Sequence, residues 1–128
     1  MSNATNLTNI IGPAFVRDIE DHYLKTNSEQ GYFIYHIEQL RQHLASLQQQ
    51  DVVKLWFAVK ANPLSKVLKT IAEQGFCFDV ASQGELEQVL AQGVAPENIL
   101  NTGPAKSKAQ IARFIDRGVN TFVVESIN

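Results

Sequence analysis

The sequence of 128 residues has a single cysteine, a small net charge and no long apolar run. One cysteine, Cys77, excludes an internal disulfide framework and a multi-cysteine zinc site, and it indicates a reducing compartment. A formal net charge of −2 argues against a nucleic-acid or membrane surface as the main partner. No stretch approaches the roughly 20 apolar residues of a membrane span, and the polar N-terminus lacks the features of a secretory signal. These absences predict a cytoplasmic protein.

Several common active-site motifs are also missing. The sequence has no Gly-rich phosphate loop of the GxGxxG or GxxxxGK[ST] type. We predict no metal site, because the three histidines show no metal-ligand spacing with other residues: His22, His36 and His43. Cys77 lies in a short apolar run and is expected to be a buried, unreactive thiol. What remains is the composition of an ordinary folded chain, 45% hydrophobic and 19% charged.

The chain is predicted to divide into a lead-in over residues 1–31 and an ordered domain over residues 32–128. The lead-in is polar and is expected to be irregular apart from a short helix around Asp18–Lys25. The domain begins with a β-prone run, Tyr32–Tyr35, and continues into an amphipathic helix from Ile37 to Leu47.

From there strands and helices alternate. Strands are predicted at Val52–Val59, Phe76–Val80, Asn98–Asn101 and Thr121–Val124. The three helices between them are expected to end at glycines, namely Gly75, Gly93 and Gly118. Strict alternation predicts parallel βαβ units. Two architectures fit, a small doubly wound sheet or part of a (β/α) barrel, since a complete barrel needs eight units and about 250 residues.

Helix starts and apolar faces can also be read from the sequence. Asn62 and Pro63 are expected to cap and open the first of these helices, with Leu64 on its buried face. The other two helices are expected to start with capping boxes, Ser82 with Glu85 and Ser107 with Gln110. Ile115 is placed on the buried face of the last helix.

Polar residues follow the apolar strands at their carboxyl ends, where parallel α/β folds place active sites. These residues are Lys60, Asp79, Asn101 and Glu125. For Asn101 and Glu125 we expect ordinary solvated strand ends. Lys60 is different, because partial desolvation near Trp56, Phe57 and Val59 would favour the neutral amine that Schiff-base formation requires. The alternative, equally compatible with its position, is a lysine that only ends the strand.

Asp79 ends the strand next to that of Lys60. Adjacent parallel strands lie about 4.8 Å apart, so the carboxylate is within reach of the lysine amine. An acid at this position also interacts favourably with the N-terminal dipole of the next helix. Both roles remain open at this point.

Four segments resemble, in order, those of a known enzyme family. The first is Phe33–Tyr35 with the helix after it, which resembles the family's entry into its barrel. The run Phe57–Pro63 resembles the cofactor-lysine motif of the fold type III, pyridoxal-phosphate-dependent decarboxylases, which include diaminopimelate, ornithine and arginine decarboxylases. Phe78–Leu86 and Asn101–Ser107 are similar to the two segments that follow in that family. The resemblance covers roughly residues 32–128 and implies an alanine-racemase-like (β/α)8 barrel, of which this chain supplies about the first half.

The resemblance also implies an activity. Lys60 matches the lysine that forms a Schiff base with pyridoxal phosphate, Ala58 matches a small residue lining the cofactor, and Asp79 matches the acid beside the lysine. The implied reaction is decarboxylation of a basic or dibasic amino acid by a cytoplasmic homodimer in the full-length form. The rest of the barrel and a C-terminal β-domain would lie beyond Asn128, so the 128-residue chain alone is expected to be inactive.

Two departures and two alternatives accompany the resemblance. His36 stands where family members often have an acid, and Asn62 is followed by Pro63-Leu64 instead of the Tyr-Gly element of alanine racemases, which favours the decarboxylases. The first alternative is a non-catalytic, decarboxylase-like protein that binds a partner, against which Lys60 argues. The second is a small open-sheet α/β binding domain without a cofactor. The sequence does not indicate which amino acid is the substrate.

Overall fold

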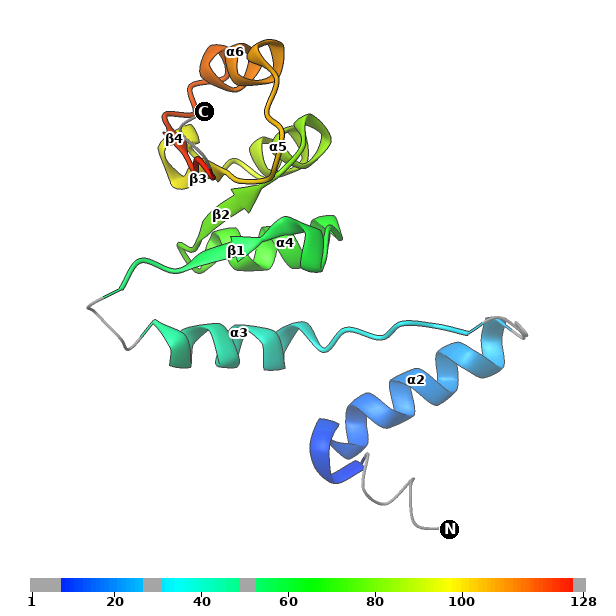
Figure 1. The fold of residues 1–128 in the computed structure, drawn as a ribbon. Helices are drawn as coiled ribbons and strands as arrows, with labels where there is room; N and C mark the ends of the chain where they lie inside the picture. Colours follow the sequence, from blue (N-terminus) through cyan, green and yellow to red (C-terminus); the bar gives the residue numbers. More distant parts are fainter. Residues whose placement is uncertain (1–7, 27–30, 49–52, 126–128) are drawn as a thin grey trace. The chain divides into compact units, whose positions relative to one another are not determined.

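The computed structural model describes residues 8–26, 31–48 and 53–125 (Figure 1). The chain divides into two compact units, residues 1–36 and residues 37–128. In the first unit, helix α2 (Pro13–Thr26) precedes the extended residues 31–36. The lead-in is therefore more helical than expected, because α2 has 14 residues and begins well before Asp18.

The second unit begins with helix α3 (Ile37–Leu47), as predicted, and continues into a sheet of four parallel strands. The strands are β1 (Trp56–Ala58), β2 (Cys77–Val80), β3 (Ile99–Asn101) and β4 (Thr121–Phe122). The helices between them are α4 (Ser65–Glu73), α5 (Gln83–Leu90) and α6 (Lys108–Asp116), with 3-10 turns η1 (Val59–Ala61) and η2 (Pro96–Asn98). The strand order β1-β2-β3-β4 follows the chain order, as in a barrel wall, whereas a doubly wound sheet reverses direction at a switch point.

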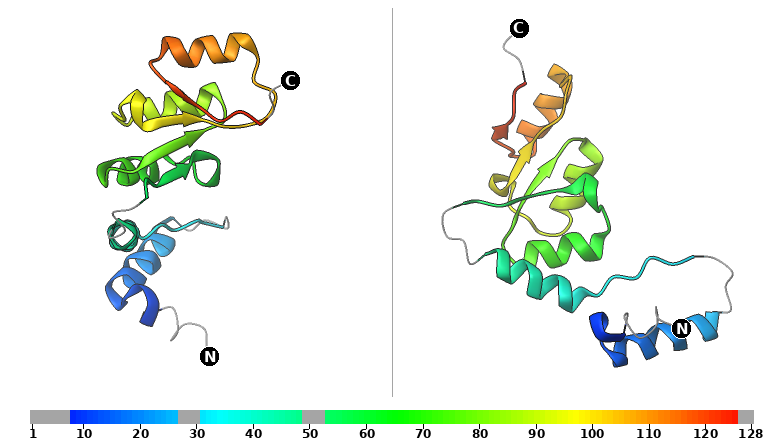
Figure 2. Two further views of the ribbon diagram at one scale, coloured as in Figure 1. Left: turned by 60° about the vertical axis from the view of Figure 1, so that its left-hand side comes forward. Right: turned by 60° about the horizontal axis from the view of Figure 1, so that its bottom comes forward.

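The core lies between the sheet and its helices. Phe57, Phe78 and Ile99 are paired in register across three strands, so their side chains share one face of the sheet. Helices α4, α5 and α6 follow one another along that face (Figure 2). The buried helix residues that meet it are Val67, Leu68, Ile71, Leu86, Val89 and Phe114. The other face of the sheet carries Ala58, Asp79 and Leu100, which are also paired in register and are only half-buried.

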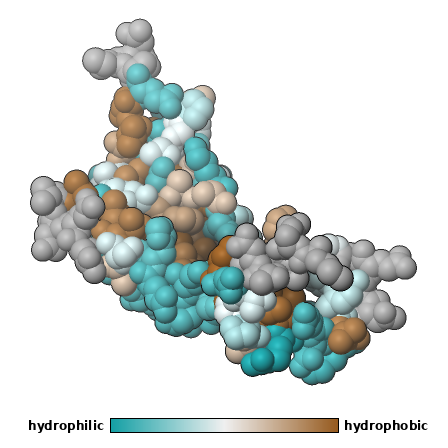
Figure 3. All heavy atoms as spheres, turned by 90° about the horizontal axis from the view of Figure 1, so that it is seen from below, coloured by the Kyte–Doolittle hydropathy of each residue, from teal (hydrophilic) through white to brown (hydrophobic). Residues whose placement is uncertain are grey.

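Large apolar side chains reach the surface in both units. In the first, Phe33 is 92% exposed and Leu24 is 75% exposed. Aromatic residues of α2 and of the extended segment, including Phe15, Tyr23 and Phe33, line a groove of about 680 Å³ in that unit. Apolar surface, drawn in brown, is seen between polar regions in Figure 3. Several large apolar side chains of the described residues are therefore exposed, although the sheet and its helices form a buried core.

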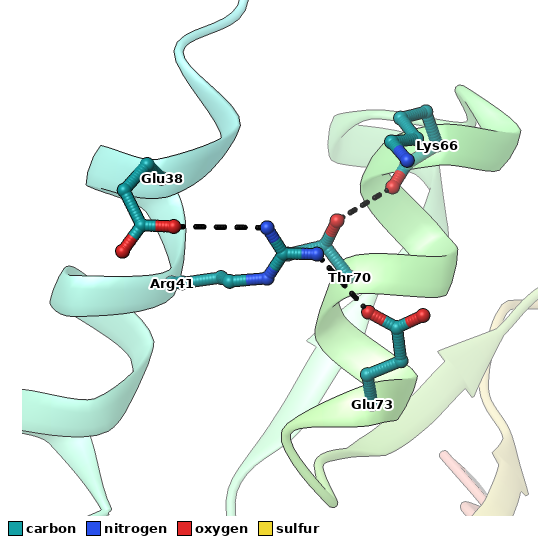
Figure 4. Close-up of polar contacts among 5 residues, drawn as sticks. All are labelled: Glu38, Arg41, Lys66, Thr70 and Glu73. Carbon is teal, nitrogen blue, oxygen red and sulfur yellow. Dashed lines mark hydrogen bonds and ion pairs between the residues drawn. The ribbon is translucent and has the colours of Figure 1, made fainter.

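Helix α3 is held against α4 by an apolar contact and an exposed ion-pair cluster. Leu44 of α3 is buried in the core. The Arg41 guanidinium lies 3.3 Å from the carboxylate of Glu73 on α4 and 3.7 Å from that of Glu38 on its own helix (Figure 4). Ion pairs this exposed contribute at most about 1 kcal/mol each, so the burial of Leu44 is the larger contribution.

Helix capping follows the sequence at two of three starts. The Ser82 and Ser107 hydroxyls accept hydrogen bonds from the backbone N–H of Glu85 (3.2 Å) and Gln110 (3.1 Å). The expected cap at Asn62 is wrong. Helix α4 begins at Ser65 after Leu64, and the Asn62 side chain accepts from the Leu64 N–H at 3.2 Å in a local turn that precedes the helix.

Other sequence predictions differ from the structure in extent. Tyr32–Tyr35 form no strand, because an isolated β-prone run needs a neighbouring edge and no described residue pairs with it. Val59 belongs to η1 and not to β1, the strand β4 ends at Phe122, and Val52 lies outside the described residues. Leu64 and Ile115 were expected in the core but are 46% and 56% exposed.

Gly118, which ends α6, should tolerate a side chain less well than Gly93, which ends α5. Both glycines have positive φ, +88° and +81°, so alanine at either position costs about 1 kcal/mol in backbone strain. A Cβ on Gly118 would also lie 3.1 Å from Pro96 Cβ, whereas nothing lies within 4 Å of a Cβ on Gly93. We expect Gly118→Ala to lower the free energy of unfolding by about 2 kcal/mol more than Gly93→Ala. Urea unfolding of the complete protein measures the difference, and equal losses would contradict the close contact.

Candidate functional site

The candidate site lies at the carboxyl ends of β1, β2 and β3. Ala58 at the end of β1 is paired in register with Asp79 of β2, so the two side chains share the half-buried face of the sheet. Lys60 follows two residues after Ala58, in the turn η1. The structure therefore brings Ala58 and Asp79 together on adjacent strands and places Lys60 at the same edge.

The environment of Lys60 differs from the expectation. Val59 is fully buried and belongs to the core, whereas Lys60 is exposed and is not enclosed by Trp56, Phe57 and Val59. The cause is the 3-10 turn, in which the Asn62 N–H donates to the Val59 carbonyl at 3.1 Å. The turn ends the strand at Ala58 and carries Lys60 out of it. Among the described residues the Lys60 amine has no hydrogen bond and no ion pair, so it is accessible to a ligand.

Asp79 is half-buried and is hydrogen-bonded to a residue of the next strand end. The Thr102 hydroxyl donates to Asp79 Oδ1 at 2.5 Å. No ion pair joins Asp79 to Lys60 in the part of the chain that the structure describes, so their approach stays a prediction. The start of α5 is capped by Ser82, and the Glu85 carboxylate accepts from the Ala81 N–H at 2.6 Å. Asp79 is therefore not needed as the cap of that helix.

Asn101 is the largest difference between expectation and structure at this edge. It is fully buried, not a solvated strand end. Its side-chain N–H donates to the Val80 carbonyl at 2.8 Å, while its Oδ1 finds no hydrogen-bond partner among the described residues. Glu125 is exposed, as expected.

Two residues that the sequence reasoning missed organise the loop after β3. Thr102 contacts Asp79, and the Lys106 amine donates to the carbonyls of Gly103 (2.5 Å) and Val123 (2.8 Å). Lys106 is half-buried, and its amine joins the segment after β3 to the segment after β4. Thr102 could have been noticed in the sequence, because its hydroxyl directly follows a predicted parallel strand, where polar side chains meet those of the neighbouring strand ends. No local signal marks Lys106, because one of its partners lies 17 residues along the chain.

The remaining polar candidates are not residues of these strand ends. In the first unit, the His36 ring lies 4.3 Å from that of Phe15, and the His22 ring lies 5.9 Å from that of Tyr32, centroid to centroid. Cys77 is buried, as predicted. The described residues contain no cluster of three or more His, Cys, Asp or Glu able to hold a metal ion. Within the same residues, no helix is both long and apolar enough to cross a membrane.

Comparison with known proteins identifies relatives for most of the chain. The family described as "Pyridoxal-dependent decarboxylase, pyridoxal binding domain" matches residues 35–128. The chain is 31% identical to ornithine decarboxylase of Neurospora crassa over 112 residues, which is 87% of the chain and 23% of that protein. It is 33% identical to antizyme inhibitor 2 of Xenopus laevis over 112 residues, 87% of the chain and 25% of that protein.

A shorter match and a solved structure point the same way. Over 70 residues, 55% of the chain, it is 44% identical to diaminopimelate decarboxylase of Pseudomonas aeruginosa, of which this covers 17%. The crystal structure of ornithine decarboxylase from Entamoeba histolytica superposes with a TM-score of 0.78 at 29% identity, over 89% of the chain and 36% of that structure. The chain thus spans about a quarter of the length of the first two relatives.

Proposed function

The chain belongs to the pyridoxal-dependent decarboxylase family, whose pyridoxal-binding domain it matches, and we propose that the complete protein decarboxylates a basic or dibasic amino acid. Its sheet is part of an alanine-racemase-like (β/α)8 barrel, and its cofactor is pyridoxal phosphate. The observation that carries the proposal is the accessible Lys60 amine at the edge of the sheet where Ala58 and Asp79 lie. The names of the relatives support an ornithine or diaminopimelate type of substrate.

The residues at this edge fit the aldehyde side of pyridoxal phosphate. A covalent link requires an accessible amine, and Lys60 has one. Ala58 presents only a methyl group beside it, which leaves room for a flat ring. Asp79 supplies a carboxylate on the neighbouring strand, with Oδ2 not hydrogen-bonded among the described residues. We propose that Lys60 holds the cofactor, that Ala58 lines its face and that Asp79 orients the lysine amine.

Each of these residues then has a distinct role in the proposed reaction. Bound pyridoxal phosphate supplies an electron sink for the electron pair left when CO₂ departs. Lys60 would hold the cofactor through its Nζ, and the free amine would accept or donate a proton at that atom. Asp79, on the neighbouring strand, would orient that amine. We propose that the complete enzyme acts as a cytoplasmic homodimer.

Borohydride labelling tests the proposed role of Lys60. Reduction of the complete protein with bound pyridoxal phosphate is expected to leave a pyridoxyl group on the peptide that contains Lys60, detected by mass spectrometry. Lys54 is the internal control, because it lies just before β1 but stacks over the Trp56 ring at 4.8 Å. Label on Lys54 or on another lysine, with Lys60 unmodified, would overturn the assignment.

A non-catalytic homologue is the second candidate function. It is favoured by the 33% identity to antizyme inhibitor 2, a protein named for its action on another protein. The two candidates differ in their chemistry, since a partner-binding homologue needs no reactive lysine. A complete protein that releases no CO₂ from ornithine, lysine or diaminopimelate and takes no label at Lys60 would support this alternative. The family match argues against the small open-sheet domain without a cofactor, and the sequential strand order argues against a doubly wound sheet.

A further inference from the structure

The hydroxyl of Thr102 makes a hydrogen bond to Asp79 that joins the ends of two strands. Thr102 directly follows β3, Asp79 belongs to β2, and Oγ1 lies 2.5 Å from Oδ1. A hydroxyl that donates to a carboxylate forms a charge-assisted hydrogen bond, which is shorter and roughly twice as strong as a neutral one. Both residues are half-buried, so competition from water is reduced.

The backbone around Thr102 is fixed independently of this hydroxyl. The Val80 carbonyl accepts from the Thr102 N–H at 3.1 Å and from the Asn101 side chain at 2.8 Å. Gly103 then turns the chain with φ of +104°, and a Cβ there would lie 3.5 Å from Ala81 Cβ. Two hydrogen bonds and a close turn therefore hold Thr102 in place before its hydroxyl meets Asp79. The hydroxyl is a preformed support, which a mobile surface threonine would not provide.

The support acts on one oxygen of the carboxylate and leaves the other available. Asp79 Oδ1 accepts from Thr102, whereas Oδ2 has no hydrogen-bond partner among the residues that the structure describes. Asp79 shares its face of the sheet with Ala58, two residues before Lys60. A carboxylate fixed at one oxygen presents the second in a defined direction, because rotation of the side chain would break the Thr102 bond.

We infer that Thr102 is a positioning residue that orients the Asp79 carboxylate at the pyridoxal phosphate site. The inference rests on the proposed function and extends it to a residue that contacts Asp79 and has no described hydrogen bond to the cofactor lysine. Thr102 acts through Asp79 alone. Its contribution should therefore depend on the hydroxyl and should disappear when the carboxylate is removed.

The test compares Thr102→Val, which keeps the shape and removes the hydroxyl, with Thr102→Ser, which keeps the hydroxyl. The dissociation constant of pyridoxal phosphate is measured by absorbance titration of the complete apoprotein. We expect Thr102→Val to raise this constant about tenfold, the effect of losing one hydrogen bond to a charged group, and Thr102→Ser to stay within about twofold of the wild type. In an Asp79→Ala background, Thr102→Val should cause no further change.

The outcomes separate this inference from the proposed function. If the wild type is labelled at Lys60 and pyridoxal phosphate has the same dissociation constant in the wild type, Thr102→Val and Thr102→Ser, the inference is wrong but the proposed function stands. The inference would also be wrong if Thr102→Val raised the dissociation constant by the same factor in the Asp79→Ala background as in the wild type, because Thr102 would then act independently of the carboxylate. Absence of any label at Lys60 in the wild type would overturn both. Thermal melts check that each variant folds, and Thr102→Ala replaces Thr102→Val if the valine variant does not.

Discussion

Lys60→Ala in the complete protein is expected to lower the rate of decarboxylation by at least roughly a thousandfold, because the residue that we propose to carry the cofactor is lost. Lys60→Arg should be equally inactive, although it keeps the positive charge, because a guanidinium does not form the covalent link. Release of CO₂ from ornithine, lysine and diaminopimelate, each at saturating concentration, measures the loss. Pyridoxal phosphate that does bind to either variant should wash out on dialysis.

The control for this experiment is Lys54→Ala. Lys54 lies six residues earlier, is also exposed, and interacts with Trp56 and with the Asn98 side chain at 3.5 Å. It should keep nearly full activity. Lys60 has no hydrogen bond or ion pair among the described residues, so its removal should leave the melting temperature of the cofactor-free protein unchanged. Melts of the cofactor-free proteins therefore distinguish a loss of activity from a loss of folding. Substantial activity in Lys60→Ala would show that another lysine carries the cofactor.

The features of the fold that the sequence predicts well are those decided by neighbouring residues. The caps at Ser82 and Ser107 each require one hydroxyl and an N–H three residues later, and both form. The helix ends at Gly75, Gly93 and Gly118 need only a residue that tolerates positive φ, and all three adopt it. The parallel order of the strands follows from the alternation, because each crossover helix returns the chain in the same direction.

The predictions that fail depend on contacts across the fold. Asn101 resembles a solvated strand end in the sequence, but the Val80 carbonyl lies beside it and the side chain is buried. Tyr32–Tyr35 have the composition of a strand but belong to no strand of the described sheet. Lys60 was expected in an apolar environment because the run before it is apolar. A 3-10 turn after Ala58 separates the buried Val59 from the exposed lysine, and the residue types alone do not show where a strand ends.

The candidate site shows the same division. Roles for Lys60, Ala58 and Asp79 could be proposed from the sequence because their motifs are continuous and resemble those of a family, and these roles stay predictions. Thr102 and Lys106 could not be assigned a role, because their partners lie 23 and 17 residues away and are brought near by the crossover connections. A motif therefore identifies the residues that carry chemistry more readily than those that hold them in place.

When the 128 residues are expressed alone, we expect them to self-associate. In the described sheet β1 is paired only with β2, and β4 only with β3, so each outer strand leaves an edge open to another chain. The sheet face that carries Ala58 and Leu100 is not covered by α4, α5 or α6. Val124, just after β4, is 74% exposed. Each 100 Å² of apolar surface left in water forgoes roughly 2.5 kcal/mol of stabilisation, which association with a second copy recovers.

Size-exclusion chromatography with light scattering over a range of concentrations, together with urea unfolding, measures this behaviour. We expect oligomers whose mass grows with concentration and a broad unfolding transition. Val124→Lys, which places a charge beside the open edge at β4, should reduce the association. Ile10→Lys is the matched control, since Ile10 is 61% exposed but belongs to the first unit and not to the sheet. A soluble monomer with a sharp two-state transition would contradict the expectation, because these strands would then form a closed domain without the remainder of a barrel.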